Sequence, residues 1–197
     1  MIPVSQPLLT DREPEYIASC LKSGWISSSG PYIEQFEQNW SRYCGRKYGV
    51  SVCNGTAALQ AAVATLGLAG GDEVIMPAFT IISCASAILH CGGTPVLVDA
   101  ESRTWTMDVT RVEEKITSRT KAIMVVHIYG HPTDMDPIVA LAQRYGLAII
   151  EDAAEAHGAE YLSGRVGATP QWQRCGSCLA TNTGKCSRGN RQVQMHR

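Results

Sequence analysis

Short apolar runs that alternate with helical segments constrain the fold of this chain more than any other feature. Four runs of strand length lie at residues 72–77, 94–100, 121–130 and 147–152. Strands that are separated by helices pair in parallel, and the helices then cover the faces of the sheet. The runs AIMVV and LAII are continuously apolar, which is typical of strands that are buried on both faces. The pattern predicts a three-layer α/β/α fold with a mostly parallel sheet.

The segments around these runs have the spacing of helices. Apolar residues recur every three or four positions, and several segments stop at glycine. We expect helices at residues 13–24, 32–43, 56–68, 81–93, 109–116 and 134–146, and a further short strand at 49–52. Asp134 is the expected N-cap of the last helix. The pattern continues without an internal repeat or a low-complexity linker, and the character of the sequence changes after about Gly167.

Composition and charge exclude several classes of protein. The chain of 197 residues is 45% hydrophobic and 18% charged, which is typical of a globular protein with a real core. Its formal net charge of −1 gives no indication of a nucleic acid or an anionic membrane as partner. No apolar run approaches the roughly 20 residues that span a bilayer, and the N-terminus lacks the pattern of a signal peptide. We therefore expect a cytoplasmic protein, in which Cys20, Cys44, Cys53, Cys84 and Cys91 are buried and reduced.

The stretch SVCNGTAALQ is the first candidate site. A strand-like segment ends at Val52, residues 54–56 form a turn, and a helix follows at once. Backbone N–H groups at a helix N-terminus are unsatisfied and bind phosphate well. Gly55 allows a ligand to approach the backbone, and the Thr56 hydroxyl adds a donor. Asn-Gly-Thr alone is also compatible with an ordinary N-cap turn, so the motif by itself favours that simpler interpretation.

The stretch LAIIEDAAEAHGAEY is the second candidate site. Asp152 ends an apolar strand, and ligands of open α/β sheets sit outside the carboxyl ends of the strands. Parallel strands place Asp152 on the same edge as the turn at residues 54–56. A carboxylate and an anion cradle on one edge suit a ligand with a cationic ring nitrogen and a phosphate, such as pyridoxal 5′-phosphate. A cap for the following turn is an equally good interpretation of Asp152 taken alone.

Seven stretches together resemble one family. They are MIPVSQPLL, SGWISSSGPYIEQFE, VCNGTAAL, GDEVIMPAFT, GGTPVLVD, TKAIMVVHIYGHPTDMD and IIEDAAEAHGAEY, and they cover residues 1 to about 167. In this order they are similar to the DegT/DnrJ/EryC1/StrS sugar aminotransferases, and most of all to perosamine-synthase-like members. The resemblance implies the large domain of a fold-type-I pyridoxal 5′-phosphate enzyme.

The resemblance also implies roles for individual residues. Gly55 and Thr56 match the phosphate-binding turn, and Asp152 matches the carboxylate that faces the pyridine nitrogen. Glu155 falls where the family has Gln or Glu near the ring hydroxyl. Ile81 stands where many members have an aromatic residue that packs on the cofactor ring. An apolar side chain still covers a ring face, so this departure is modest.

The catalytic lysine of the family is missing from its expected place. In the family it forms the Schiff base with the cofactor, and family spacing puts it near residue 181. Lys185 is the nearest candidate, but it is displaced by four positions and lacks the Ser-Phe context. The resemblance therefore predicts a catalytically impaired, truncated form of the enzyme.

Residues 168–197 differ in composition from the rest of the chain, with five basic residues and no Asp or Glu. We interpret them as an aberrant, disordered tail from a frameshift after Gly167, in place of the family's small C-terminal domain. A zinc site is the rival interpretation, because Cys175, Cys178, Cys186 and His196 are suitable ligands. A dehydratase-like relative with histidine in place of the lysine is a lower-ranked alternative. Elsewhere His127, His131 and His157 lack the spacing of metal ligands, so no metal is expected there.

The expected function follows from the resemblance. It implies transfer of an amino group, with glutamate as the donor, to a 4-keto-6-deoxy sugar nucleotide, in the synthesis of surface polysaccharide or O-antigen. Family members are homodimers with shared active sites. A non-catalytic fragment that binds cofactor or pairs with an intact subunit is the alternative from another class.

Overall fold

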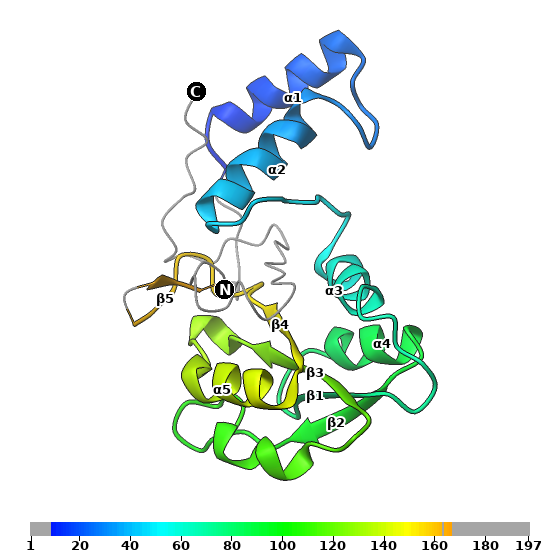
Figure 1. Cartoon of the computed structure of the whole chain (residues 1–197). Coiled ribbons are helices and arrows are strands. Elements are labelled where there is room, and N and C mark those ends of the chain that lie inside the picture. Colours follow the sequence, from blue (N-terminus) through cyan, green and yellow to red (C-terminus); the bar gives the residue numbers. More distant parts are fainter. Residues whose placement is uncertain (1–8, 163, 167–197) are drawn as a thin grey trace, which may run out of the picture. The chain divides into compact units, whose positions relative to one another are not determined.

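The computed structural model describes residues 9–162 and 164–166, and these fall into two compact units, residues 9–51 and 52–166 (Figure 1). The first unit holds two helices, α1 (Arg12–Ser23) and α2 (Pro31–Tyr43). Tyr16 of α1 and Tyr32 of α2 contact each other edge to face, with ring centroids 5.1 Å apart. Both helices lie where the apolar spacing predicts them, and α1 ends at Gly24, whose φ of 76° suits glycine.

The prediction of a strand at residues 49–52 is wrong. The segment is irregular, because the Ser51 N–H donates to the Glu37 carboxylate at 2.7 Å instead of to a neighbouring strand. The backbone also passes close to α2: a Cβ on Gly49 would lie 2.6 Å from the Glu37 carbonyl oxygen. Packing of the segment against α2 thus replaces sheet pairing.

The second unit is built on a four-stranded parallel sheet in the order β2-β1-β3-β4. Its strands are β1 (Glu73–Pro77), β2 (Thr94–Val98), β3 (Thr120–Val126) and β4 (Ala148–Asp152). The direction of chain progress reverses between β1 and β3, which makes this the switch point of the sheet. A small antiparallel pair, β5 (Glu160–Tyr161) and β6 (Gly164–Arg165), follows β4.

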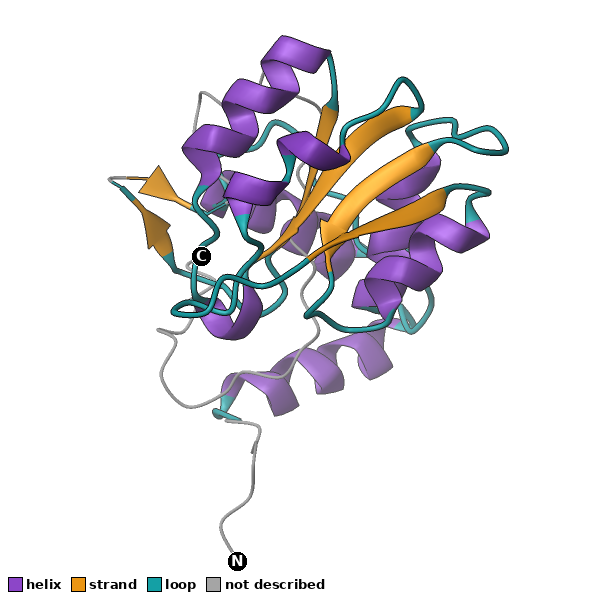
Figure 2. Cartoon of the chain, turned by 90° about the horizontal axis from the view of Figure 1, so that it is seen from below, coloured by secondary structure: helices purple, strands orange, loops and turns teal. Residues whose placement is uncertain are grey.

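Helices cover both faces of this sheet, as Figure 2 shows. Alternate residues of β3 face opposite ways: Met124 packs with α3 (Gly55–Ala64) and α4 (Ser83–His90), whereas Ile123 and Val125 pack with α5 (Met135–Tyr145). Burial of β3 on both faces explains its continuously apolar sequence. The predicted three-layer α/β/α fold with a parallel sheet is confirmed.

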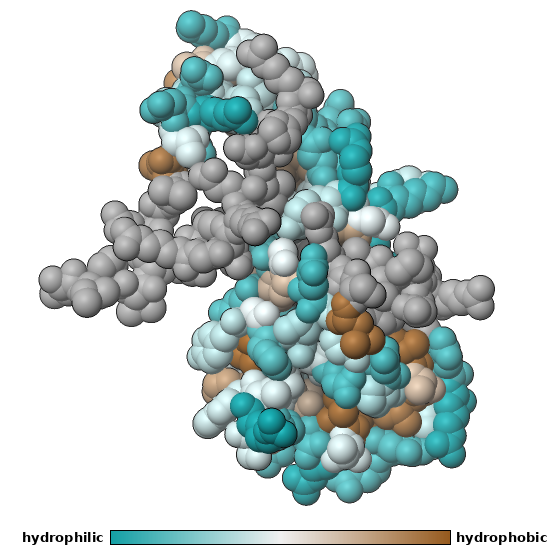
Figure 3. Space-filling model, turned by 90° about the vertical axis from the view of Figure 1, so that its left-hand side faces the viewer, coloured by the Kyte–Doolittle hydropathy of each residue, from teal (hydrophilic) through white to brown (hydrophobic). Residues whose placement is uncertain are grey.

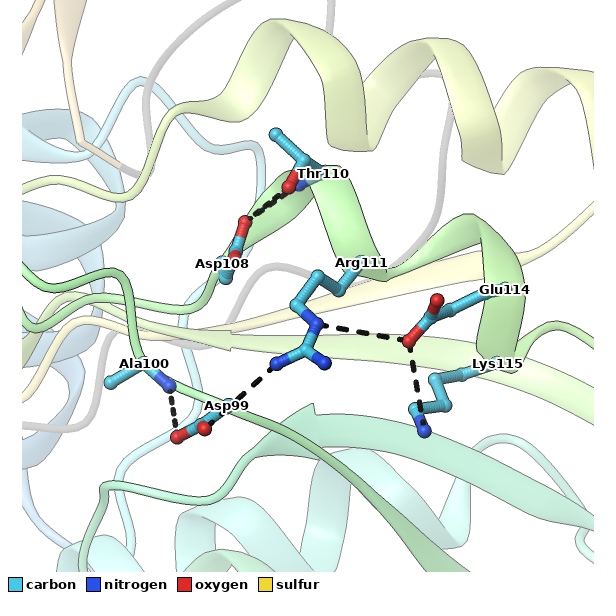
Figure 4. A network of polar contacts seen from close by, with 7 residues as sticks. All are labelled: Asp99, Ala100, Asp108, Thr110, Arg111, Glu114 and Lys115. Carbon is cyan, nitrogen blue, oxygen red and sulfur yellow. Dashed lines mark hydrogen bonds and ion pairs between the residues drawn. The ribbon is translucent and has the colours of Figure 1, made fainter.

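The segment after β2 differs from the prediction. Residues 109–116 form two 3₁₀ turns, η1 (Val109–Arg111) and η2 (Glu113–Lys115), instead of one α-helix. Four of its eight residues are β-branched, which disfavours a regular helix. Surface ion pairs tie the turns to the end of β2, with Arg111 between Asp99 and Glu114 (Figure 4).

Within the part of the chain that the structure describes, no helix has the length and apolar character needed to cross a membrane.

Candidate active site

The strand β4 delivers Asp152 to the face of the sheet that carries α3 and α4. Ile150 packs on that face, and side chains alternate along a strand, so Asp152 points the same way and Glu151 the opposite way. Both carboxylates are buried, with 4% and 1% of their surface exposed. Register places Asp152 beside Val126, at the carboxyl end of β3. The alternation thus separates two adjacent acidic residues into two different environments.

The N-terminus of α3 lies at the predicted turn. The exposed Asn54 is the N-cap, and its side chain accepts a hydrogen bond from the Ala57 N–H at 2.9 Å. Within residues 9–162 and 164–166, the backbone N–H groups of Gly55 and Thr56 have no hydrogen-bond partner. The cap therefore satisfies one donor of the helix and leaves two adjacent donors for an anion.

Two adjacent residues of α4 join this turn to Asp152. The Ser83 hydroxyl lies 2.9 Å from the Thr56 hydroxyl, and the Cys84 thiol lies 3.6 Å from Oδ2 of Asp152. Sequence reasoning missed both Ser83 and Cys84. The signal was present, since two small polar residues open a largely apolar helix two residues after the Pro-x-x-Thr turn.

Burial shapes the chemistry around Asp152. Desolvation raises the pKa of the Cys84 thiol to about 12, helped by the negative charge of Asp152, so the thiol stays protonated near neutral pH. Burial likewise lowers the pKa of His157, although Asp152 opposes this shift. The other oxygen of Asp152 accepts a hydrogen bond from the Ala154 N–H at 3.1 Å. Asp152 is thus held by donors on both oxygens while its neighbours remain uncharged.

A separate buried network lies on the other face. Nε2 of His127 is 3.3 Å from the Glu151 carboxylate, and Nδ1 of His127 accepts a hydrogen bond from the Thr133 N–H at 3.1 Å. An accepting Nδ1 places the proton on Nε2, which then donates to Glu151. Both ring nitrogens of His127 are engaged at the end of β3, which favours a structural role.

Glu155 shapes the loop that follows β3. Its carboxylate accepts a hydrogen bond from the Tyr129 N–H at 2.7 Å, and this holds Tyr129 at a left-handed φ of 52°. The next residue, Gly130, has a φ of 85° and passes so close to Glu155 that a Cβ would lie 3.2 Å from its carbonyl oxygen. This contact crosses from the end of β4 to the end of β3, at the edge of the sheet that carries Asp152.

Apolar side chains reach solvent at the same edge. Ile81 is 60% exposed in the loop after β1, and its neighbour Ile82 is also exposed. Phe79 contacts the rings of Trp105 and Tyr129, with centroids 5.4 and 6.2 Å away. Brown apolar surface interrupts the polar surface of the second unit in one view (Figure 3). The strand ends thus supply apolar cover as well as polar groups.

Of the predicted site residues, Gly55, Thr56, Ile81, Asp152 and Glu155 all lie at the carboxyl edge of the sheet or at the start of α3. Contacts through α4 join Thr56 to Asp152, while Glu155 contacts the β3 loop.

The predicted tail lies outside the described residues, and so do Lys185 and the candidate zinc ligands Cys175, Cys178, Cys186 and His196. The described ranges contain no cluster of three or more His, Cys, Asp or Glu residues suited to a metal ion. Their five cysteines are free. The predicted burial is confirmed for Cys44 and Cys84, is only partial for Cys20 and Cys91, and is wrong for Cys53, which lies exposed in the turn before α3.

Comparison with known proteins agrees with this geometry. The chain is 50% identical to GDP-perosamine synthase from Escherichia coli O157:H7 over 166 residues, which are 84% of this chain and 46% of that protein. The crystal structure of 3-amino-5-hydroxybenzoic acid synthase matches with a TM-score of 0.79 and 35% identity, over 85% of this chain and 44% of the other.

The pyridoxal phosphate form of a sugar aminotransferase from Streptococcus pneumoniae matches with a TM-score of 0.77 and 32% identity, over 83% of this chain and 45% of that one. These matches confirm the predicted fold-type-I architecture. The chain spans about half the length of the relatives it matches. The model of the DegT/DnrJ/EryC1/StrS aminotransferase family matches residues 7–175. The chain therefore belongs to the DegT/DnrJ/EryC1/StrS aminotransferase family.

Proposed function

We propose that this chain carries the cofactor-binding half of a pyridoxal 5′-phosphate-dependent nucleotide-sugar aminotransferase of the perosamine-synthase type. The observation that carries the proposal is the pair of contacts through α4. They link an anion-binding helix N-terminus at Thr56 to a buried carboxylate at Asp152. Those two groups match the two charged ends of pyridoxal phosphate, an anionic phosphate and a ring nitrogen that carries a proton.

The donor set of the site fits this cofactor. The N–H groups of Gly55 and Thr56 and the Thr56 hydroxyl are phosphate donors. Asp152 would hold a proton on the ring nitrogen, and its burial would strengthen that charge pair. Ile81 would cover one ring face. Glu155, whose carboxylate holds the β3 loop, is the residue that we propose near the ring hydroxyl.

When bound, pyridoxal phosphate supplies an electron sink for removing a proton next to the amino group. The part of this chain is to bind and orient the cofactor and to keep the ring nitrogen protonated. The substrate that we propose is a 4-keto-6-deoxy sugar nucleotide, with glutamate as amino donor, in a cytoplasmic homodimer that serves surface polysaccharide synthesis. The support is the 50% identity with GDP-perosamine synthase.

Turnover by this chain depends on the lysine. Family spacing puts it near residue 181, where the sequence has Thr181, and Lys185 is four positions away. We therefore expect reversible cofactor binding with little or no turnover. The same observation favours the alternative role of a non-catalytic fragment that binds cofactor or pairs with a complete subunit.

Borohydride reduction tests the proposal. Purified protein is mixed with pyridoxal phosphate, its absorbance is recorded, and the mixture is reduced and digested for mass spectrometry. Saturable binding that is lost in Asp152→Ala, without a trapped adduct, supports a cofactor-binding chain without its lysine. A stoichiometric adduct on Lys185 would show that the chain is catalytically equipped. The absence of any saturable binding would refute the proposed function.

A further inference from the structure

The thiol of Cys84 is buried against the carboxylate that defines the site. Cys84 has no exposed surface, and its Sγ lies 3.6 Å from Oδ2 of Asp152, a hydrogen-bonding distance for the large sulfur atom. The two residues are 68 positions apart in sequence and come from different elements, α4 and β4. A contact between them fixes the Asp152 side chain relative to α4.

The direction of this hydrogen bond follows from the protonation states. With a pKa raised to about 12, the thiol keeps its proton near neutral pH and is the donor in its contact with Oδ2 of Asp152. The S–H group of Cys84 therefore donates to Asp152. The Thr80 hydroxyl lies 3.4 Å from the same sulfur, and because the S–H points to Asp152, Thr80 donates to Sγ. A chain of donors runs from the Pro-x-x-Thr turn through Cys84 to Asp152.

We propose that Cys84 is a positioning residue that orients Asp152 toward the ring nitrogen of the cofactor. This inference rests on the proposed function. Ala154 N–H holds Oδ1 of Asp152 and Cys84 holds Oδ2, so the plane of the carboxylate is fixed from two sides. The neighbouring residue Ser83 contacts Thr56 at the other end of the site. One helical turn thus touches both cofactor-binding ends.

Titration with pyridoxal phosphate tests the role in binding. Cys84→Ala should weaken binding about three- to tenfold, because the lost S–H group is a weak donor that acts on the cofactor only through Asp152, and Cys84→Ser should restore it to within about twofold. The matched control is Cys91→Ala. Cys91 caps the other end of α4, and its thiol donates to the Gln60 carbonyl oxygen at 3.7 Å, so it tests helix packing alone. Equal weakening in Cys84→Ala and Cys91→Ala, or no weakening in Cys84→Ala, would overturn the role.

Infrared spectroscopy tests the contact without the cofactor. The S–H stretching band of Cys84 is isolated as the difference between wild type and Cys84→Ser. In Asp152→Asn this band should move to higher frequency, because a neutral amide is a weaker acceptor than a carboxylate. An unmoved band would overturn the inference even if the wild type binds pyridoxal phosphate. A shifted band in a protein that binds no cofactor would leave the contact established and would refute the proposed function instead.

Discussion

The Thr56 hydroxyl offers a sharp test of the anion cradle at the start of α3. It lies 2.9 Å from the Ser83 hydroxyl, and either group donates to the other. Two hydroxyls carry two protons and their mutual hydrogen bond uses one, so the pair keeps one proton for an anion. Thr56→Val removes the donor and retains the β-branched shape.

The expected loss is the contribution of one hydrogen bond to a charged group, about 1.5–3 kcal/mol. Because about 1.4 kcal/mol corresponds to a tenfold change, the Kd for pyridoxal phosphate should rise roughly 10- to 100-fold. Absorbance titration or equilibrium dialysis measures this. Inorganic phosphate, used as a competitor, should lose affinity in the same variant, because the predicted contact is to the phosphate group.

Thr65→Val is the matched control, because it makes the same substitution at the other end of α3. There the hydroxyl donates to the Ala62 carbonyl oxygen at 2.6 Å and faces no predicted ligand. Its Kd should equal that of the wild type. A Kd for Thr56→Val within about twofold of the wild type, or equal weakening in Thr65→Val, would refute the placement of the phosphate at this helix.

Three further predictions concern stability and the β3 loop. The pKa of Glu73 lies below its ordinary 4.5, chiefly because Thr117 and then Arg119 donate to its carboxylate. The ionised Glu73 carboxylate therefore stabilises the fold above pH 4.5, and this stabilisation is lost as the pH falls through the lowered pKa. Urea unfolding should show Glu73→Gln less stable than wild type at about pH 7, and the difference in unfolding free energy should shrink below about pH 4. Ile123→Ala in the fully buried β3 should cost about 2–5 kcal/mol of unfolding free energy and Ile123→Val about 0.5–1.5; equal costs would contradict the packing on α5. Glu155→Ala should speed hydrogen exchange at the amide that it holds in the β3 loop, while Glu155→Gln, whose side-chain oxygen still accepts, should restore protection; unchanged exchange in Glu155→Ala would argue against that contact.

Several elements were predictable because their signals are local. The apolar run of β3 and the glycine that ends α1 predict a strand and a helix end directly from chain geometry. The segments at 49–52 and 109–116 were mispredicted. Ser51 takes its partner from α2, which lies far away in sequence. Four of the eight residues after Asp108 are β-branched, which disfavours a regular α-helix.

The residues of the candidate site likewise fall into those that a local stretch of sequence reveals and those that only the fold reveals. Asp152 and Thr56 were identified from the sequence, because a carboxylate at a strand end and a glycine-containing turn before a helix carry their chemistry in adjacent letters. Ser83 and Cys84 were missed, because their importance lies in contacts across 27 and 68 positions. The role of His127 also depends on distant groups, because its contacts with Glu151 and Thr133, which favour a structural role, join separate segments of the chain.

The sequence by itself determined the parallel α/β architecture and the family, and it predicted the residue types of the proposed phosphate and ring-nitrogen site. These follow from periodicity and from motifs that adjacent residues specify. Only the tertiary structure decided which face of β4 carries Asp152, which thiol donates to it and which hydroxyl pairs with Thr56. The physical reason is that such contacts depend on strand register and on how α4 packs against the sheet, and neither is encoded in a local stretch of sequence.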